Sequence, residues 1–381
     1  MLICLFVISL SVPLYTYFIY PGLVMVLGVL GRKTYQKDES YLPTVSLIIS
    51  TYNEEGHIRK KIENSLGLDY PKEKLEIHIS SESTDRTNEI AQEYHQKGVI
   101  LHAFSGRRGK AASLYRVVPS TRGEILVFSD ANAFYHTDAL RKLVRNLADP
   151  AVGCVVGQLN YNKPSESVGG LGEKLYWAYD KFLRKRSNGL NGFVPGVNGA
   201  IFAIRKPLYF PISPNRGDDY ELCTLVAIHG FVVVAEPEAI ADEAGSETTK
   251  QQFARKIRVV RWNALSSLIL IRNAVSFGRW AIVFQIFSLR LLRYTVPFWL
   301  ILCFLSTAVL SVQSRGFGLL LLLQGAFYAF SLVSLLADRI GWKLPKLLLI
   351  PSYFLLVNSA AAVAITLGVC FGQSPTWKKQ R

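Results

Sequence analysis

Long apolar runs lie at both ends of the chain and leave a mixed, more polar middle. Residues 1–31 contain no Asp, Glu, Lys or Arg, and further apolar runs follow near 294–312, 317–337 and 347–370. Roughly 20 apolar residues in helical conformation are enough to cross a bilayer. The pattern therefore predicts one membrane-spanning helix before the middle region and three hydrophobic segments after it.

The middle region, residues 43–250, alternates short apolar runs with amphipathic segments. The apolar runs are rich in β-branched residues and are predicted to be strands: 45–50, 75–80, 124–130, 152–160, 200–204 and 231–236. The amphipathic segments are predicted to be helices: near 55–66, 84–97, 108–118 and 137–147. This alternation is typical of βαβ units, so we expect an α/β domain with a mostly parallel sheet flanked by helices. Ligands of such sheets bind beyond the carboxyl ends of the strands.

A basic amphipathic stretch follows the middle region. Arginines recur in it at positions 255, 258 and 261, with apolar residues between them, which predicts helices lying on the membrane surface. We therefore divide the chain into five parts: a membrane helix over 1–31, a soluble domain over 43–250, interfacial helices over 251–290, membrane helices over 291–372 and a basic tail over 373–381.

The charge of the chain narrows the choice of partners. Of 381 residues, 43 are Lys or Arg and 28 are Asp or Glu, a net charge of +15 that suits nucleic acid, anionic lipid or a phosphorylated substrate. The basic residues cluster beside the apolar segments: Arg32, Lys33, Lys37, Arg255, Lys256, Arg258, Arg261, Arg339, Lys343, Lys346, Lys378, Lys379 and Arg381. Such clusters favour membrane lipids over nucleic acid, and they indicate a soluble domain on the cytoplasmic side of a bacterial inner or plasma membrane. Four crossings would put the basic tail on the opposite side, so the number of spans stays open.

Composition and cysteine content exclude further classes of protein. An apolar share of 50% excludes a disordered chain. The five cysteines are scattered and odd in number: Cys4, Cys154, Cys223, Cys303 and Cys370. They indicate neither a disulfide framework nor a C-x-x-C metal site, and we expect the soluble domain to lie in a reducing compartment.

Polar side chains close the first and third predicted strands. Thr51, Asn53 and Glu54 follow the first, and Asp130 and Asn132 close the third. An Asp two residues before an Asn offers the hard oxygen ligands that Mg²⁺ or Mn²⁺ prefers. An isolated pair of this kind also occurs as a simple turn at the end of a strand, so the motif does not decide the function alone.

Five motifs in order resemble the family 2 inverting glycosyltransferases. They are Thr51-Tyr52-Asn53-Glu54-Glu55, Ser83-Thr84-Asp85-Arg86-Thr87, Gly109-Lys110, Asp130-Ala131-Asn132 and Gly217-Asp218-Asp219-Tyr220. The resemblance covers about Pro43 to Trp262, and the flanking apolar segments are similar to the membrane-bound branch of the family. It implies the A-type fold, with a mostly parallel Rossmann-like sheet, and a nucleotide-diphospho-sugar as donor.

The resemblance assigns one group of residues to the nucleotide. It implies that Thr51, Asn53 and Glu54 line the base and ribose pocket and that Lys110 contacts a phosphate. The family usually has Asp-Gly or Asp-Ala before Ser-Thr-Asp, whereas this chain has Ser80-Ser81-Glu82. Glu82 is expected to supply the missing carboxylate.

A second group is assigned to the reaction. The resemblance implies that Asp130, with Asn132 nearby, holds Mg²⁺ or Mn²⁺, which stabilises the departing diphosphate. Asp219 is similar to the general base of the family, with Asp218 beside it. Two adjacent carboxylates repel each other, which raises one pKa and favours a base.

A third group is assigned to the acceptor or the phosphates. Many processive members carry Gln-x-x-Arg-Trp, where this chain reads Arg258-Val259-Val260-Arg261-Trp262. Arg258 and Arg261 are expected near the diphosphate, with Trp262 stacking on the acceptor. A basic, Trp-bearing helix in the headgroup layer is the alternative interpretation of this stretch.

The sequence thus predicts a membrane-anchored inverting glycosyltransferase with a cytoplasmic catalytic domain and a lipid-linked or cell-envelope glycan acceptor. A processive polysaccharide synthase is the first alternative, which the replaced Gln disfavours. A catalytically inactive nucleotide-sugar-binding scaffold is the second. A transporter is excluded because the hydrophobic segments hold almost no ionisable groups. The donor sugar, nucleotide base, acceptor, number of transfers and oligomeric state stay open.

Overall fold

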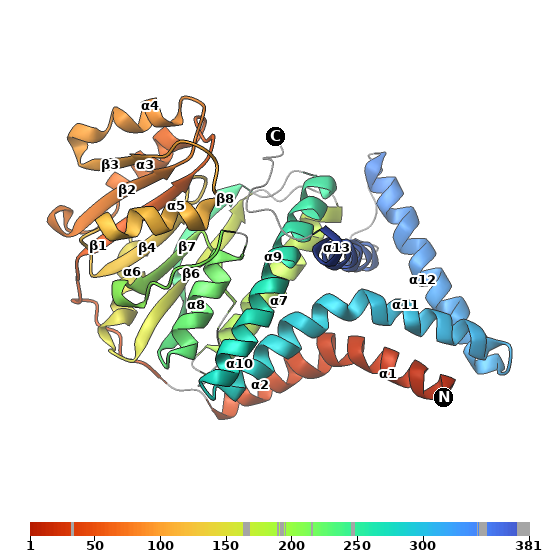
Figure 1. Ribbon diagram of the computed structural model, residues 1–381. Coiled ribbons are helices and arrows are strands. Elements are labelled where there is room, and N and C mark those ends of the chain that lie inside the picture. Colours follow the sequence, from red (N-terminus) through yellow and green to blue (C-terminus); the bar gives the residue numbers. More distant parts are fainter. Residues whose placement is uncertain are drawn as a thin grey trace.

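The structure is a computed structural model of the chain. It describes residues 1–31, 34–162, 168–188, 190, 194, 196–214, 216–244, 248–340, 342 and 349–371, without the side chains of 162–177, 339 and 371. Figure 1 shows an α/β domain on one side and long helices extending from it on the other. The predicted basic tail, residues 373–381, and the basic residues at 32, 33, 343 and 346 lie outside the described residues.

One eight-stranded sheet forms the centre of the soluble domain, in the order β3-β2-β1-β4-β7-β6-β8-β5. Its strands are β1 Val45–Thr51, β2 Leu75–Ser81, β3 Val99–Ala103, β4 Ile125–Asp130, β5 Phe134–Tyr135, β6 Val152–Asn162, β7 Ile201–Arg205 and β8 Val232–Ala244. Parallel pairing runs without interruption from β3 to β4 and returns between β6 and β8. The predicted α/β class is confirmed, with β7 antiparallel to both of its neighbours and β5 antiparallel to β8.

Helices cover both faces of this sheet, close to the predicted positions. They are α3 Ile58–Leu66, α4 Thr87–Gln92, α5 Lys110–Val117, α6 Ala139–Val144, α7 Val168–Ser187, α8 Asp218–Ile228 and α9 Thr249–Ser276. Residues of α3, α4 and α6, such as Ile62 and Leu143, pack on one face of the sheet. Residues of α5, α8 and α9, such as Leu114, Cys223 and Leu270, pack on the other. The predicted helix over 84–97 is shorter because α4 ends at Gln92 and a 3-10 turn follows.

The basic stretch forms α9, a single helix of 28 residues that begins with a capping box between Thr248 and Gln251. Leu270 and Ala274 of α9 are buried in the core of the soluble domain, so this helix is part of the domain's packing. After a short turn, α10 (Trp280–Ile286) continues through a π-helical turn at Phe287–Leu291 into α11 (Leu292–Ser311). No helix end occurs at the predicted boundary at 290.

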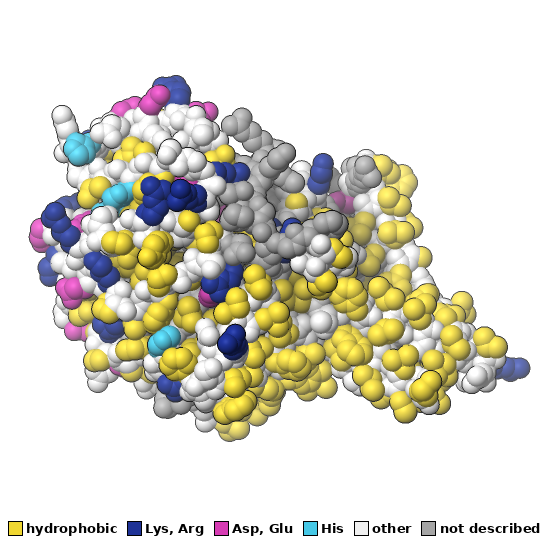
Figure 2. All heavy atoms as spheres, in the orientation of Figure 1, with side chains coloured by type: hydrophobic (Ala, Val, Ile, Leu, Met, Phe, Trp, Pro, Cys, Tyr) yellow, Lys and Arg dark blue, Asp and Glu magenta, His cyan; other side chains and the backbone are white. Residues whose placement is uncertain are grey.

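Four helical segments among the described residues are long and apolar enough to cross a membrane: Leu2–Leu30, Trp280–Ser311, Arg315–Asp338 and Leu349–Cys370. The first comprises α1 (Leu2–Leu14), a π-helical turn at Tyr15–Ile19 and α2 (Tyr20–Leu30). The last two lie in α12 (Arg315–Arg339) and α13 (Leu349–Phe371). Figure 2 shows yellow apolar side chains gathered over these helices, with the charged side chains mainly over the soluble domain.

The connection from α2 to β1 is tied to the soluble domain. Lys37 lies 2.6 Å from the buried carboxylate of Glu236, and Glu39 lies 2.5 Å from Arg145. Tyr35, Tyr41 and Leu42 pack against the hydrophobic core, as partly buried side chains. The segment that follows α2 is therefore a part of the folded domain.

Candidate active site

Lys110 lies among the carboxylates that the sequence predicts for catalysis and metal binding. Its Nζ atom is 2.7 Å from Oδ1 of Asp130 and 3.7 Å from Oδ2 of Asp218, and it donates to the carbonyl of Gly199 at 3.3 Å. Asp130 closes β4 and Lys110 begins α5. The residue before Lys110, Gly109, has φ 97°, which L side chains rarely adopt.

Asp219 stands in the first turn of α8, directly after Asp218. Burial, together with the charge of Asp218, raises the pKa of Asp219 to about 6, and Lys110 acts in the opposite direction. The backbone N–H of Tyr220 donates to Oδ1 of Asp219 at 2.8 Å. Asp219 is thus a carboxylate that is mostly ionised at neutral pH but more basic than an ordinary Asp.

The charge of Lys110 is stabilised by the same carboxylates. Burial alone would lower the pKa of Lys110, but Asp130 and Asp218 outweigh it and hold that pKa above its usual range. Lys110 therefore remains a cation at any pH at which the protein would work. It offers a fixed positive charge in the centre of the cluster.

Gly199 was not among the residues assigned a role from the sequence, yet it touches Asp219. A Cβ atom at Gly199 would lie 3.0 Å from Oδ2 of Asp219 and 3.3 Å from its Cβ. A side chain at this position would be tight against Asp219, which would have to shift by a few tenths of an ångström. The sequence signal was the glycine-rich segment before β7, which did not indicate which glycine is required.

The donor set fits a divalent cation. Oδ2 of Asp218 is buried and has no hydrogen-bond donor in the part of the chain that the structure describes. Asp130 adds a second hard oxygen ligand, and Mg²⁺ is usually bound by one or two carboxylates together with substrate phosphates. Among the described residues no group of three or more His, Cys, Asp or Glu could hold a metal ion alone, so phosphate oxygens would have to complete the site.

The side chain of Asn132 is hydrogen-bonded to a carboxylate on another strand. Its side-chain amide Nδ2 donates to Oε1 of Glu243 at 2.9 Å. Glu243 lies on β8, so this bond joins the turn after β4 to the far part of the sheet. The predicted role of Asn132 near the metal remains a prediction.

The predicted nucleotide residues lie in the two loops that follow β1 and β2. Asn53 has φ 53°, and its Oδ1 accepts from the backbone N–H of Thr84 at 2.8 Å. The backbone N–H of Glu54 donates to Oγ1 of Thr87 at 2.9 Å. Oγ1 of Thr51 is buried and has no hydrogen-bond partner among the described residues. These bonds bring the two predicted loops together beside Thr51.

Glu82 connects the loop after β2 to the start of α5. Its Oε2 accepts from the backbone N–H groups of Arg108 and Gly109, at 3.1 and 2.9 Å. Its Oε1 is buried without a hydrogen-bond partner among the described residues. The side chain therefore supports the turn that carries Lys110, and its predicted contact with the nucleotide remains a prediction.

Comparison with known proteins agrees with this geometry. Residues 46–209, which include β1 to β7, match the family described as Glycosyl transferase family 2. Residues 46–209 are a family 2 glycosyltransferase domain. The site described above lies at the carboxyl ends of β1, β2 and β4 of this glycosyltransferase domain and is completed by α8, just beyond the matched residues.

Relatives and a solved structure resemble larger parts of the chain. It is 31% identical over 200 residues to the beta-monoglucosyldiacylglycerol synthase of a Nostoc species, covering 49% of this chain and 43% of that protein. It is 26% identical over 257 residues to the probable glycosyltransferase YdaM of Bacillus subtilis, covering 65% and 61%. The chain thus spans less than two thirds of these relatives. The solved structure of mannosyltransferase PcManGT from Pyrobaculum calidifontis, in complex with GDP-Man and Mn²⁺, shares the fold with a TM-score of 0.72. The two sequences are 21% identical, and the match covers 96% of this chain and 99% of that one.

Arg258 of α9, which the sequence assigns to the acceptor or the phosphates, lies near the site of the glycosyltransferase domain. Burial, followed by the charge of Arg255, lowers the pKa of Arg258 to about 10. Asp130 and Asp218 oppose this shift, which shows that Arg258 is within electrostatic range of both carboxylates. Arg258 also lies over the ring of Trp262, 5.7 Å from its centroid.

Arg261 lies against α13, a helix that is long and apolar enough to cross a membrane. A Cβ atom at Gly368 of α13 would be 3.8 Å from Cγ of Arg261. The two arginines predicted to contact the diphosphate therefore have different surroundings. The roles of Arg261 and Trp262 toward the phosphates and the acceptor remain predictions.

Helix α9 also holds the start of α8 in place. The hydroxyl of Ser266 donates to Oε2 of Glu221 at 2.9 Å and accepts from the backbone N–H of Gly217 at 3.3 Å. The hydroxyls of Tyr220 and Ser267 are 3.3 Å apart. The residues on both sides of the acidic pair are thus fixed by buried polar contacts that the sequence pattern did not reveal.

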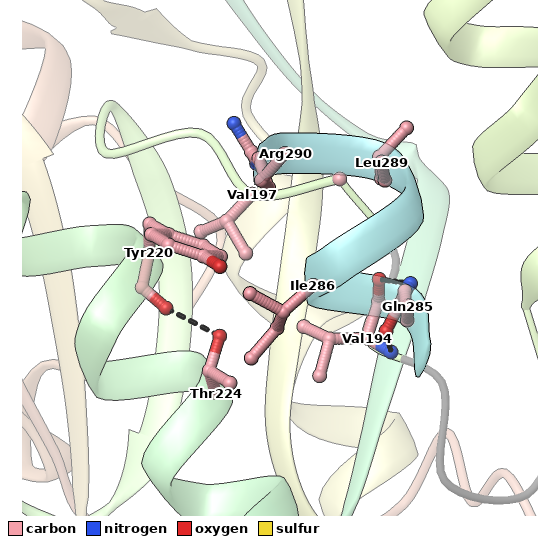
Figure 3. A pocket seen from close by; sticks show the side chains of 9 residues that line it. Val194, Val197, Tyr220, Thr224, Gln285, Ile286, Leu289 and Arg290 are labelled. Carbon is pink, nitrogen blue, oxygen red and sulfur yellow. Dashed lines mark hydrogen bonds between the residues drawn. The ribbon is translucent and has the colours of Figure 1, made fainter. Parts of the chain in front are cut away.

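The apolar run α10–α11 contacts the same region (Figure 3). The amide of Gln285 accepts from the backbone N–H of Val194 at 2.8 Å and donates to its carbonyl at 2.7 Å. The guanidinium of Arg290 lies over the ring of Tyr220, 4.4 Å from its centroid. A helix that is apolar enough to cross a membrane is therefore in direct contact with the loop before β7 and with the residue after Asp219.

Proposed function

We propose that the chain is a membrane-anchored inverting glycosyltransferase that moves a sugar from a nucleotide-diphospho-sugar to a hydroxyl of a lipid-linked or glycan acceptor. The observation that carries this proposal is the arrangement of Asp130, Asp218 and Asp219 around Lys110 at the carboxyl edge of the sheet. We further propose that the catalytic domain faces the cytoplasm. The four apolar helical segments support the membrane attachment.

In this reaction the acceptor oxygen forms a bond to the anomeric carbon as the bond from that carbon to the diphosphate oxygen breaks. The hydroxyl proton passes to Asp219. A pKa of about 6 suits this role, because the carboxylate is ionised at neutral pH and still has appreciable basicity. Attack from the face opposite the leaving group gives inversion at the anomeric carbon.

The electron pair of the broken bond remains on the nucleoside diphosphate. Lys110 and Arg258 are two cations among the described residues that would face that charge, because both interact with Asp130 and Asp218. Asp130 and Asp218 would hold Mg²⁺ or Mn²⁺, which supplies further electrostatic stabilisation of the departing diphosphate. The Mn²⁺ named with GDP-Man in the PcManGT structure is consistent with the use of a divalent cation.

A lipid acceptor is supported by two observations. The apolar run α10–α11 contacts the loop before β7 and Tyr220, which places the reactive edge close to a membrane-spanning segment. A beta-monoglucosyldiacylglycerol synthase and a dolichyl-linked glucuronosyltransferase of Methanococcus voltae are among its relatives. A hydroxyl of a glycolipid or of a lipid-linked glycan is therefore the preferred acceptor.

The test uses purified full-length chain, a panel of labelled nucleotide-sugars and a membrane lipid extract. Label in organic-extractable lipid is the expected result, and Asp219→Asn is expected to abolish it with nucleotide affinity nearly unchanged. Asp69→Asn, an exposed carboxylate paired with Arg141, serves as the control with the same chemical change. Label in a polymer would instead support a polysaccharide synthase. Nucleotide binding without turnover in the unaltered chain would contradict an enzymatic role.

A further inference from the structure

A cavity of about 640 Å³ lies between β6, β8, α7 and the segment that follows α2. Val156, Val234 and Ile240 form apolar parts of its lining, and Gln158 and Asn160 contribute amides. None of the catalytic carboxylates lines it, nor does Lys110. Its volume is within the range of ligand-binding pockets, which is about 300–1,000 Å³.

Two lysines give one wall of this cavity a positive charge. Lys181 and Lys185 are four residues apart on α7, so they share one face of the helix. Nζ of Lys181 donates to the amide oxygen of Asn160 at 2.9 Å. Burial and the charge of Arg184 lower the pKa of Lys181. Within the described parts of the chain, no carboxylate lies within salt-bridge distance of either lysine.

The remaining charges of the lining are compensated locally. Lys37 pairs with Glu236 at 2.6 Å, and Arg184 pairs with Asp180 at 2.6 Å. Glu238 pairs with Arg145 at 3.0 Å. Among the described residues, Lys181 and Lys185 are thus the residues of the lining whose positive charge has no carboxylate within salt-bridge distance. The net positive charge of the lining favours an anionic ligand.

The cavity lies beside the end of the first membrane-spanning segment. Thr34 and Tyr35, a few residues after the end of α2, belong to its lining. Helix α2 and the end of α7 touch, because a Cβ atom at Gly28 would collide with the carbonyl oxygen of Arg186. An anionic group that reaches this cavity is therefore at the level where a helix leaves the bilayer.

We propose that this cavity binds the anionic, phosphate-bearing headgroup of a membrane lipid. Lys181 and Lys185 face the phosphate, Gln158 and Asn160 face headgroup hydroxyls, and the apolar wall receives the first carbon atoms of the lipid. A bulk anionic phospholipid and the phosphate of a lipid-linked glycan carry this same chemistry. The site is separate from the nucleotide site, so it does not depend on the transfer reaction.

The test measures lipid binding by the full-length chain in nanodiscs. Three compositions are compared: phosphatidylcholine alone, phosphatidylcholine with phosphatidylglycerol, and phosphatidylcholine with a polyprenyl phosphate. Native mass spectrometry counts the retained lipid, and thermal unfolding measures stabilisation. The double variant Lys181→Gln/Lys185→Gln is compared with Lys72→Gln/Lys97→Gln, which removes two exposed lysines near the opposite edge of the sheet.

We expect the unaltered chain and the Lys72/Lys97 variant to retain one anionic lipid, and the Lys181/Lys185 variant to bind it roughly tenfold more weakly. Retention with phosphatidylglycerol identifies bulk phospholipid as the source, and retention only with polyprenyl phosphate identifies the lipid-linked source. Equal binding by all three proteins, or an equal loss in both variants, would overturn the proposal. Because no sugar is transferred in this assay, lipid binding without transferase activity would contradict the proposed enzymatic function and leave the cavity assignment intact.

Discussion

Gly199 brings the backbone before β7 into contact with the side chain of Asp219. A Cβ atom at this glycine would lie 3.0 Å from Oδ2 of the carboxylate, and the carbonyl of Gly199 accepts a hydrogen bond from Lys110. The proposed base is therefore closely packed against a backbone segment at which an added side chain would press on its carboxylate.

Gly199→Ala should lower kcat without a comparable loss of donor affinity. The added methyl group requires the Asp219 carboxylate to shift by a few tenths of an ångström, and since a misplacement of about 1 Å costs on the order of a hundredfold in rate, a loss of roughly several-fold is expected. Steady-state kinetics and nucleotide titration measure the two effects. In Gly67→Ala the nearest atom would be 3.4 Å away, so this control should retain its activity. A Gly199→Ala enzyme with full kcat would show that Asp219 is not placed by this contact.

The rate of transfer should fall as the pH is lowered through about 6, because burial and Asp218 raise the pKa of Asp219 to this value. Below this pKa the base is protonated, and kcat/KM should fall about tenfold per pH unit. Asp218→Asn removes the neighbouring negative charge and should move the acid limb to lower pH. Normalised pH profiles at saturating metal would reveal the shift, and identical acid limbs in the two proteins would contradict the coupling.

Arg258→Gln should slow the reaction far more than Arg261→Gln. Arg258 is within electrostatic range of Asp130 and Asp218, whereas Arg261 lies against Gly368 of α13. Loss of one group that stabilises developing charge costs roughly a hundredfold to a thousandfold in kcat. Parallel kinetics of the two variants provide the comparison. Equal losses would mean that both arginines, or neither, face the diphosphate.

Chelation of divalent cations should abolish transfer, and Mn²⁺ or Mg²⁺ should restore it. Asp130→Ala should raise the Mn²⁺ concentration needed for half-maximal nucleotide binding, because it removes a proposed ligand of the ion. Asn132→Ala should change it less, since the Asn132 amide is bonded to Glu243. Titration of nucleotide affinity against Mn²⁺ measures both. A metal requirement that is unchanged in Asp130→Ala would exclude this carboxylate as a ligand.

Ser266→Ala should destabilise the start of α8. The buried hydroxyl of Ser266 donates to Glu221 and accepts from the backbone N–H of Gly217. Leaving these buried partners unsatisfied should lower the free energy of unfolding by about 1–3 kcal/mol. The midpoint of thermal unfolding should fall accordingly. Ser276→Ala removes an exposed hydroxyl that bonds only within its own helix and should leave the midpoint nearly unchanged. Measured in the same detergent, the midpoint of thermal unfolding of Ser266→Ala should lie clearly below that of Ser276→Ala.

The pattern of apolar and polar residues predicted the structural features that depend on residues close together in the chain. The alternation of apolar and amphipathic runs predicted six of the eight strands, and residues that close strands, such as Thr51 and Asp130, indeed lie at one edge. It missed the edge strand β3, because only the first of its five residues is buried and its apolar run is short. The reversed direction of β7 was not predictable, because apolar alternation does not encode strand direction. The two-residue strand β5 is too short to show any period.

The sequence motifs predicted candidate residues of the site, but they did not predict the contacts that these residues make with distant parts of the chain. The bond between Asn132 and Glu243 joins residues 111 positions apart, which no spacing within the motif reveals. Arg258 and Arg261 are three residues apart on one helix and so differ by only about 60° around its axis. Which of them faces the carboxylates depends on how α13 packs against α9, and that is a property of the folded chain.

The ties between the α2–β1 connection and the soluble domain have a practical consequence for dissecting the protein. Tyr35, Tyr41 and Leu42 pack against the same core as the strands, and Lys37 is a partner of a carboxylate that has no access to solvent. A fragment trimmed to begin at β1 would uncover this apolar surface and remove one of the two cations that pair with Glu236, leaving Arg145 at 3.2 Å. An engineered cleavage site that separates α1 and α2 from the sheet would have to be placed ahead of Tyr35.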